Sequence, residues 1–239
     1  MRRWRAVARL HGLILRRYFV ENGFSHYWLE TRRKKVGEPS FYLSAGIHGD
    51  EAGATEGAIA WAEENGSLLE QANWTIFPCL NPFGLTNNLR VNAEGRDLNR
   101  ECHNPEVPMI RAWQSLLTGR RYDLAMCLHE DYDAQGFYIY ELAERPLSLS
   151  MELLAAARRF LPADVRRKID DRPFRARGFM QRHFLDPSLP DGPESIYLGK
   201  NHASVCLTLE TPSEFDLDRR IRTQVQLIRK SCDWIRRNS

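Results

Sequence analysis

Hydrophobic and polar positions along the chain alternate in blocks that predict strands followed by helices. Short apolar runs bounded by Asn, Gly or Pro predict strands, and these runs are Phe41–Ile47, Trp74–Leu80, Leu124–Leu128, Phe137–Leu142 and Val205–Leu209. The segments between them that predict helices are Ala52–Glu64, Val107–Leu117 and Met151–Phe160. Residues 81–106, rich in Asn, Gly and Pro, predict a long loop, whereas residues 161–204 show no clear pattern.

The C-terminal segment carries the clearest helical pattern. A single apolar stripe recurs at steps of four and three residues, which is the period of a helix with one buried face; its members are Ile221, Val225, Ile228, Cys232 and Ile235. Ser213 followed by Asp216 predicts the start of this helix.

The alternation of strands and helices predicts an α/β fold, with a sheet covered by helices on both faces. Several strands are continuous apolar runs, as expected for strands buried on both sides. The length of 239 residues is typical of one large domain, so we expect residues 1–239 to form a single domain.

The composition of the chain argues against two classes of binding partner, nucleic acids and membranes. The net charge is only +3 despite 34 Lys and Arg residues, and no basic stripe alternates with stacking aromatic residues. We therefore expect no nucleic acid among the partners. No run approaches the roughly 20 apolar residues that span a bilayer, so we expect no membrane partner either.

The five cysteines are widely spaced, and none forms a C-x-x-C pair. This pattern favours a reducing compartment over a disulfide framework. Arg9, His11, Arg16 and Arg17 interrupt any apolar core that a signal peptide would need. We expect a soluble, cytoplasmic protein.

Polar side chains follow three of the predicted strands. His48 and Glu51 come after "FYLSAGI", His129 after "DLAMCL", and Glu210 after "SVCLTL". In sheets of this class, sites form at the carboxyl ends of the strands. Catalytic zinc takes three nitrogen, oxygen or sulfur ligands and keeps one open position, so His48, Glu51 and His129 predict a zinc site. Glu210 is then a candidate to accept and donate a proton.

The long loop adds arginines in "LRVNAEGRDLNR". An arginine fork pairs with a carboxylate through two hydrogen bonds. One such arginine could hold an anionic end of a substrate, and another could stabilise a developing oxyanion.

The ordered motifs HGDE, NPFG, R…DLNR, LHE and TLE, within residues 44–212, resemble the zinc carboxypeptidase superfamily (peptidase family M14), including its succinylglutamate desuccinylase/aspartoacylase branch. The resemblance implies a mixed, mostly parallel twisted sheet with helices on both faces. It implies a zinc-dependent hydrolase of the carboxypeptidase type, which cleaves an amide bond next to a free carboxylate in a small peptide. The alternative is an N-acyl amino acid deacylase of the succinylglutamate desuccinylase/aspartoacylase type.

The resemblance also implies roles for single residues. His48, Glu51 and His129 match the zinc ligands, and Glu210 matches the general acid/base. Arg90 matches the arginine that stabilises the oxyanion, with Arg96 as a competitor.

The substrate-binding candidates come from two segments. Asn99 and Arg100 match the pair that holds the terminal carboxylate, although Arg100 could instead pair with Asp97. Tyr197 in "ESIYLG" is the candidate for a tyrosine that closes over the substrate.

Two further alternatives remain open. Two acidic residues, Glu130 and Asp131, lie beside His129, and the proposed chemistry gives no evident reason for them. Together with Asp50 they are the obvious source of ligands for a second metal ion. A non-catalytic binding protein that keeps the fold is a rival from a different class, against which the intact Glu210 argues.

Overall fold

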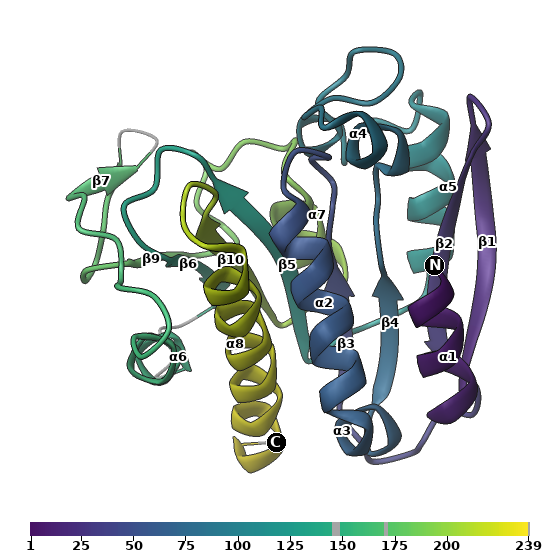
Figure 1. Ribbon diagram of the computed structural model, residues 1–239, viewed down its shortest axis with the longest axis horizontal. Coiled ribbons are helices and arrows are strands. Elements are labelled where there is room, and N and C mark those ends of the chain that lie inside the picture. The colour runs from purple at the N-terminus through teal and green to yellow at the C-terminus, as the bar shows by residue number, and fades with distance from the viewer. Residues whose placement is uncertain (145–148, 170–171, 239) are drawn as a thin grey trace.

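The computed structural model describes residues 1–144, 149–169 and 172–238 (Figure 1). The described strands are β1 (Leu13–Glu21), β2 (Phe24–Thr31), β3 (Ser40–Ser44), β4 (Asn73–Phe77), β5 (Leu124–Asp131), β6 (Tyr138–Ala143), β7 (Lys168–Ile169), β8 (Arg172–Pro173), β9 (Phe179–Arg182) and β10 (Val205–Pro212). The described α-helices are α1 (Arg2–Leu10), α2 (Ala52–Glu64), α3 (Gly66–Glu70), α4 (Pro82–Asn87), α5 (Pro108–Leu117), α6 (Leu149–Ala157), α7 (Glu194–Asn201) and α8 (Leu217–Asn238), and η1 (Leu98–Arg100) is a 3₁₀ turn.

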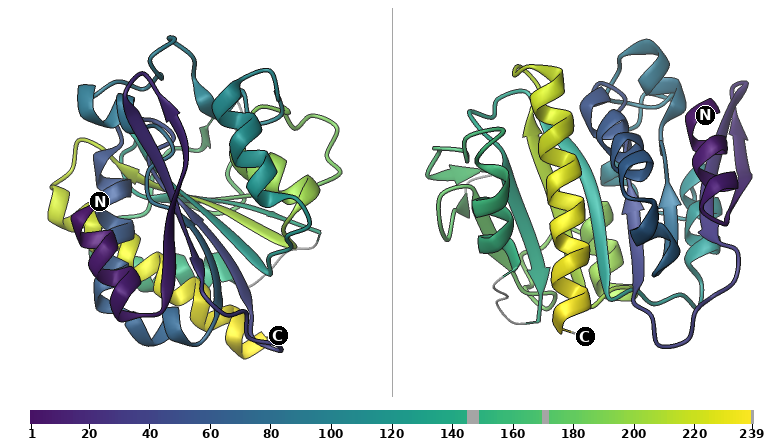
Figure 2. Two further views of the ribbon diagram at one scale, coloured as in Figure 1. Left: turned by 90° about the vertical axis from the view of Figure 1, so that its right-hand side faces the viewer. Right: turned by 60° about the horizontal axis from the view of Figure 1, so that its bottom comes forward.

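Eight of the described strands form one twisted sheet in the order β1-β2-β4-β3-β5-β10-β6-β9. The four central strands β4, β3, β5 and β10 run parallel to one another. The hairpin β1–β2 joins one side in antiparallel pairing, and β6 joins the other. Figure 2 shows the twist of this sheet from two further directions. The architecture is the mixed, mostly parallel sheet that the sequence predicted.

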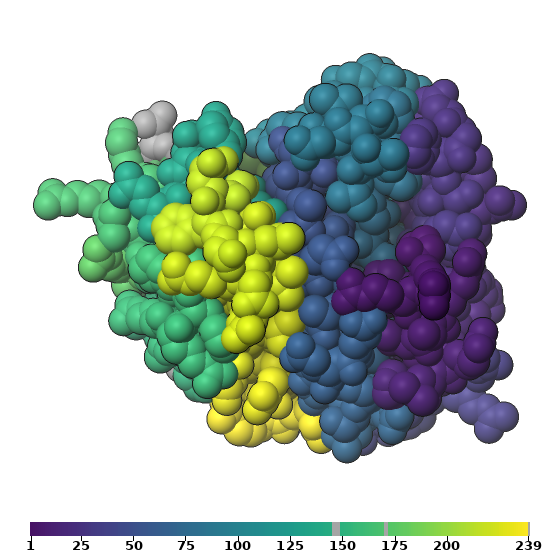
Figure 3. Space-filling view, in the orientation of Figure 1, coloured from purple at the N-terminus to yellow at the C-terminus, as the bar shows by residue number. Residues whose placement is uncertain are grey.

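Helices cover both faces of the sheet. On one face α1, α2, α6 and α8 enclose a core that includes Trp61, Leu227 and Ile228. On the other face α5 and α7 enclose a second core that includes Trp113 and Leu198. In the space-filling view α8 and α2 lie side by side across the front (Figure 3). The central strands are therefore buried on both sides, which explains their continuous apolar sequences.

Most predicted elements are present, with shifted ends. The helix Ala52–Glu64 has the predicted bounds. The C-terminal helix begins at Leu217, directly after Asp216, whose carboxylate accepts the backbone N–H of Arg219 at 3.1 Å. This contact satisfies one of the N–H groups that the first turn of a helix leaves free.

The description of residues 81–106 as an unbroken loop was wrong, because this segment holds α4 and η1. Asn81 caps α4 by accepting the N–H of Gly84 at 2.8 Å, and Pro82 occupies the first helical position, where its missing N–H costs nothing. Asp97 caps η1 in the same way, since its Oδ1 accepts the N–H of Asn99 at 2.9 Å. No helix among the described residues is long and apolar enough to cross a membrane.

Candidate metal centre and substrate cavity

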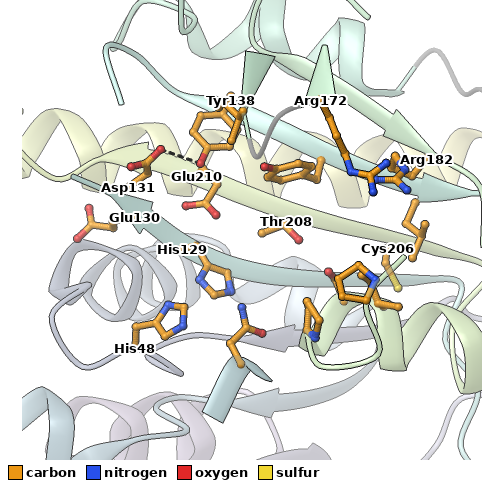
Figure 4. Close-up of a pocket in the computed structure, with 18 of the residues that line it drawn as sticks. His48, His129, Glu130, Asp131, Tyr138, Arg172, Arg182, Cys206, Thr208 and Glu210 are labelled. Carbon is orange, nitrogen blue, oxygen red and sulfur yellow. Dashed lines mark hydrogen bonds between the residues drawn. The ribbon is translucent and has the colours of Figure 1, made fainter. Parts of the chain in front are cut away.

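The candidate site lies at the carboxyl edge of three neighbouring parallel strands, β3, β5 and β10. His48 and Glu51 lie in the turn between β3 and α2, whereas His129 and Glu210 lie on β5 and β10. Glu210 and His129 are direct partners in the strand register, so their side chains project from the same face of the sheet. The structure thus brings all four predicted side chains to one place, and Figure 4 shows His48, His129 and Glu210 of this group.

The turn that presents His48 is held tightly against the segment that contains α4. Gly49 donates its N–H to the carbonyl of Leu89 at 3.1 Å. A Cβ atom on Gly49 would lie 1.9 Å from the carbonyl carbon of Gly84, so no larger residue fits without moving the backbone. The glycine of HGDE is therefore needed to place the histidine before it.

His48, Glu51 and His129 converge on one point. The Glu51 carboxylate lies between the two rings, with Oε1 2.5 Å from His48 Nδ1 and Oε2 3.0 Å from His129 Nδ1. All three residues are buried, with 2 to 4% of their surface exposed. One ligand atom from each lies within 4.8 Å of the other two, and no other such group of metal-ligating side chains occurs in the described part of the chain.

The pKa values of His48, Glu51 and His129 are shifted mainly by the opposite charges beside them. Burial alone would raise the pKa of Glu51, but His129 and His48 outweigh it and lower that pKa to about 2. Burial alone would lower the pKa values of the two histidines, yet the carboxylates beside them raise both. Two nitrogens and one carboxylate that converge in a buried pocket are a donor set that fits a metal ion with one open position.

Asp97 supports the cluster from outside. Its Oδ1 lies 3.1 Å from Nε2 of His48, the ring nitrogen that faces away from Glu51. Such a contact fixes the orientation and tautomer of a ligating histidine. The sequence indicated Asp97 only as a rival partner for Arg100, and the "DLNR" motif was the signal that could have identified this role.

Glu210 is half-buried beside charged groups, and one of its carboxyl oxygens is fully buried without a partner among the described residues. Its Oε2 has no hydrogen bond to any described residue and no contact with solvent. Burial, together with the nearby Glu51, raises the pKa of Glu210 to about 8. A buried polar atom without a partner is unusual in a folded protein, and this one belongs to a carboxyl group that lines the cavity.

Arg90 lies beside the same cluster, whereas its competitor Arg96 does not. Arg90 donates from Nε to Asp97 at 3.0 Å, and its guanidinium lies 3.7 Å from Glu51. Arg96 pairs instead with Glu94 and Glu101. Arg90 lines the cavity and Arg96 does not.

Asn99 and Arg100 also line the cavity. The Oδ1 atom of Asn99 accepts the backbone N–H of Glu194 at 2.8 Å, so the amide group of Asn99 keeps its two N–H donors for other partners. Arg100 donates to the backbone carbonyl of Asn99 at 3.2 Å and forms no ion pair with a described acidic residue. The alternative in which Arg100 pairs with Asp97 is not what the structure shows, because Arg90 and His48 occupy that carboxylate.

Tyr197 is the one predicted site residue that the structure does not bring to the cavity. Its ring packs on Trp113 and His202, with centroids 5.2 and 5.6 Å apart. The half-buried ring packs against the core beneath α7, and Tyr197 is not among the residues that line the cavity.

The two acidic residues beside His129, Glu130 and Asp131, form hydrogen bonds within the fold. The buried Glu130 carboxylate forms two 2.8 Å hydrogen bonds with Arg220 and accepts the N–H of Gly53 at 2.7 Å. Asp131 accepts hydrogen bonds from Tyr138 Oη and from Arg166. Both carboxylates are therefore occupied by contacts within the fold, which argues against their use for a second metal.

The cavity has a volume of about 820 Å³ and reaches well beyond the histidine cluster. Thr208 and Cys206 of β10 continue its floor away from Glu210. At the end opposite His48, the guanidinium groups of Arg172 and Arg182 lie close together (Figure 4).

Ser188 joins these two arginines. Its Oγ accepts from Arg172 at 3.2 Å and from Arg182 at 2.9 Å. Arg182 also pairs with Asp186, whereas Arg172 forms no ion pair with a described acidic residue. Both arginines lie in residues 161–204, where no clear pattern of hydrophobic and polar positions is visible.

The sequence of residues 38–163 matches the model of the succinylglutamate desuccinylase/aspartoacylase catalytic domain. No curated protein matches the chain in sequence.

Solved structures with the same fold come from several bacteria. A protein from Shewanella amazonensis described as a candidate metallopeptidase is 22% identical, with a TM-score of 0.85 over 98% of this chain and 91% of that chain. A metallo-carboxypeptidase from Burkholderia cenocepacia is 17% identical, with a TM-score of 0.74 over 100% of this chain and 68% of that chain. A metallo-carboxypeptidase from Pseudomonas aeruginosa, in complex with (2-guanidinoethylmercapto)succinic acid, is 18% identical, with a TM-score of 0.72 over 98% of this chain and 68% of that chain.

Proposed function

The chain belongs to the succinylglutamate desuccinylase/aspartoacylase family of the zinc carboxypeptidase superfamily, and from that premise we propose that it is a zinc-dependent hydrolase of the carboxypeptidase type. The proposed reaction is cleavage of an amide bond next to a free carboxylate. The observation that carries the proposal is the convergence of His48, Glu51 and His129 beside the unpaired carboxyl oxygen of Glu210.

His48, Glu51 and His129 are the residues that would hold zinc. When bound, zinc supplies Lewis acidity, which polarises a carbonyl group and makes water acidic near pH 7. A cation at this place also favours the charged form of Glu210, because opposite charges within a few ångströms lower the pKa of a carboxyl group.

Glu210 moves the proton in the proposed mechanism. Its carboxyl group, which lines the cavity, takes a proton from the attacking water and then delivers that proton to the nitrogen of the leaving amine. Arg90 places its guanidinium beside the cluster, where it would stabilise the negative charge that develops on the carbonyl oxygen.

Asn99 and Arg100 would hold the free carboxylate of the substrate. Arg100 lacks an acidic partner among the described residues, and the amide N–H groups of Asn99 remain available. Together they offer several donors to one anion, which would select the bond beside that anion. Tyr197 is left out of the mechanism because its ring packs against Trp113 and does not line the cavity.

The family match favours a second candidate, an N-acyl amino acid deacylase, in which the chemistry is the same but the acyl group is not an amino acid. Arg172 and Arg182 favour a substrate with a further anionic group at the far end of the cavity. Both candidates require the free carboxylate, so they differ only in the group on the other side of the scissile bond.

The test combines metal content with a substrate panel. Zinc is measured in the purified protein and in the His48→Ala and His129→Ala variants, with about one zinc per chain expected only in the parent protein. The panel contains dipeptides and N-acyl amino acids, each with a free and an amidated carboxylate. Turnover is expected only with the free carboxylate, and the preferred acyl group separates the two candidates.

The Glu210→Gln variant tests the proton transfer. Turnover should fall by roughly 10²- to 10⁴-fold, the usual contribution of a general acid/base, while zinc content stays unchanged. Glu214→Gln, the same change at an exposed carboxylate that does not line the cavity, is the matched control and should keep full activity. Activity of Glu210→Gln within a few-fold of the parent protein, with zinc bound, would contradict the mechanism.

A further inference from the structure

A carboxyl group that the proposed mechanism does not use is buried beneath the cavity. Glu194 is the first residue of α7, and only 1% of its surface is exposed. Its carboxyl group accepts a hydrogen bond from Tyr42 Oη on β3. The same phenol oxygen accepts from the indole N–H of Trp113 on α5 at 3.0 Å. The start of α7 is thereby tied to a strand and a helix of the core.

The backbone of Glu194 contacts the candidate site directly. The first N–H groups of a helix have no partner within the helix, and the N–H of Glu194 donates to Oδ1 of Asn99 at 2.8 Å. Because this bond holds the Oδ1 atom of Asn99, it determines that the Nδ2 atom is the one presented to the cavity. No described residue accepts a hydrogen bond from the Nδ2 atom of Asn99, so that atom is left for a ligand.

A second contact holds the same two segments together. Cys102 donates its N–H to the carbonyl of Gly192 at 3.1 Å. A Cβ atom on Gly192 would lie 2.6 to 2.9 Å from the backbone of Arg100, so the two backbones touch without room for a side chain. Residues 192–194 therefore lie directly against the turn that carries Asn99 and Arg100.

Burying a carboxyl group is costly unless it is hydrogen-bonded, and an apolar residue of similar volume would avoid that cost. Burial raises the pKa of Glu194, as expected for a group removed from water. Tyr42, which lies in the centre of the sheet, donates a hydrogen bond to the carboxyl, and the side chains of Ser44 and Cys127 also lie against it. The hydrogen bond from Tyr42 thus fixes the first turn of α7 relative to the sheet. It thereby also fixes the backbone N–H of Glu194, from which Asn99 accepts a hydrogen bond.

We propose that Glu194 is a positioning residue that, anchored by Tyr42, aims the side-chain amide of Asn99 into the cavity and so sets the affinity for the substrate's free carboxylate. This inference rests on the proposed function, because it assigns Asn99 to that carboxylate. Glu194 touches no substrate and acts only through Asn99.

The test compares four variants by kcat and KM on the best substrate of the panel, in the zinc-loaded full chain. Glu194→Leu removes the acceptor for Tyr42, Glu194→Gln keeps it, Asn99→Ala removes the positioned amide, and the double variant combines Glu194→Leu with Asn99→Ala. We expect Glu194→Leu to raise KM roughly five- to tenfold with kcat little changed, which corresponds to the loss of about one hydrogen bond. Glu194→Gln should restore a KM close to that of the parent protein.

The double variant separates positioning from general stability. If Glu194 acts through Asn99, Glu194→Leu adds nothing to the KM of Asn99→Ala, because residues that share one interaction are not additive. Independent, multiplicative effects on KM would overturn the proposal, as would an unchanged KM in a folded Glu194→Leu protein. Asn99→Ala with an unchanged KM would instead reject the carboxylate role of Asn99, and with it that part of the proposed function.

A second pair of variants keeps the test valid if Glu194→Leu does not fold. Tyr42→Phe removes only the hydroxyl that anchors Glu194, and it should raise KM in the same direction. Tyr122→Phe is the matched control, because Tyr122 packs on Tyr42 with ring centroids 5.5 Å apart, whereas the hydroxyl that binds Glu194 is that of Tyr42. Equal KM values for the two variants would overturn the proposal.

Discussion

The Nε2 atom of His48 lies 3.1 Å from Oδ1 of Asp97, on the side of the ring that faces away from Glu51. Asp97 thus links three candidates of the site, since it also accepts from Nε of Arg90 and from the backbone N–H of Asn99. A carboxylate in this position holds the imidazole in the tautomer that leaves Nδ1 free for a metal.

The first prediction concerns this contact. Asp97→Asn keeps the size and an acceptor oxygen but removes the charge, so zinc affinity should fall by roughly 10- to 100-fold, as for other partners of ligating histidines. Competition with a chelator of known affinity measures the change. Asp191→Asn, which alters an exposed carboxylate paired with Lys200, is the control. Equal zinc affinities of Asp97→Asn and the parent protein would show that Asp97 does not tune the site.

The second prediction concerns the pH dependence of stability in the metal-free protein. The pKa of Glu210 is raised from 4.5 to about 8 in the folded state by burial. Between these two values the folded chain retains a proton that the unfolded chain has released. The free energy of unfolding should therefore fall as the pH rises through this window, with the full loss reached above pH 8.

Glu210→Gln cannot ionise and serves as the reference. The free energy of unfolding of both proteins is measured by urea titration from pH 4 to pH 9. The value for Glu210→Gln minus the value for the parent protein should increase as the pH rises. The gain is at most about 5 kcal/mol, since a tenfold change in a proton equilibrium corresponds to about 1.4 kcal/mol. A difference between the two proteins that stays constant with pH would show that Glu210 is not buried as described.

The residues that the sequence located best are those whose position depends on local pattern alone. His48, His129 and Glu210 each follow an apolar run, and the alternation of strands and helices implies that such runs end at one edge of a parallel sheet. The order of the strands then brings β3, β5 and β10 side by side. Local hydrophobic periodicity and the topology rules of α/β sheets were sufficient for this part of the site.

The residues that the sequence placed less well depend on packing between distant segments. Tyr197 faces the core because α7 lies against Trp113, which is 84 positions earlier in the chain. Arg172 and Arg182 lie on strands of two and four residues, too short to show a period. The hairpin β1–β2 was missed because the outer strand is half exposed, and Arg16 and Arg17 interrupt its apolar pattern.

The third prediction concerns the buried ion pair of Glu130 and Arg220. Glu130 has no exposed side-chain surface, and Arg220 bonds both of its oxygens. Arg220→Met leaves that carboxylate without its cation and should lower the free energy of unfolding by roughly 3 to 5 kcal/mol. Guanidinium denaturation measures the effect.

Arg222, two positions later on α8, provides the control. It forms an ion pair with Asp218 at the surface, where both side chains are more than half exposed. Arg222→Met should therefore cost about 0 to 1 kcal/mol. Similar losses for the two variants would contradict a buried pair, whereas loss of zinc from a folded Arg220→Met protein would indicate that Glu130 also orients the neighbouring His129.

The fourth prediction concerns the cationic end of the cavity. Arg172 and Arg182 share Ser188 as an acceptor and lie at the end of the cavity opposite His48. A guanidinium fork binds a second carboxylate through two hydrogen bonds. Substrates with an additional acidic group should therefore be preferred over neutral ones of the same size.

The Arg172→Gln/Arg182→Gln double variant tests this preference. Its KM should rise by roughly tenfold or more for substrates with the additional acidic group, because a charged hydrogen bond contributes about 1.5 to 3 kcal/mol, and should change little for neutral substrates. Arg175→Gln, an exposed arginine in the same segment that bonds Gln181, should leave both values unchanged. An equal rise in KM for acidic and neutral substrates would show that the two arginines shape the cavity wall but do not bind the acidic group of the substrate.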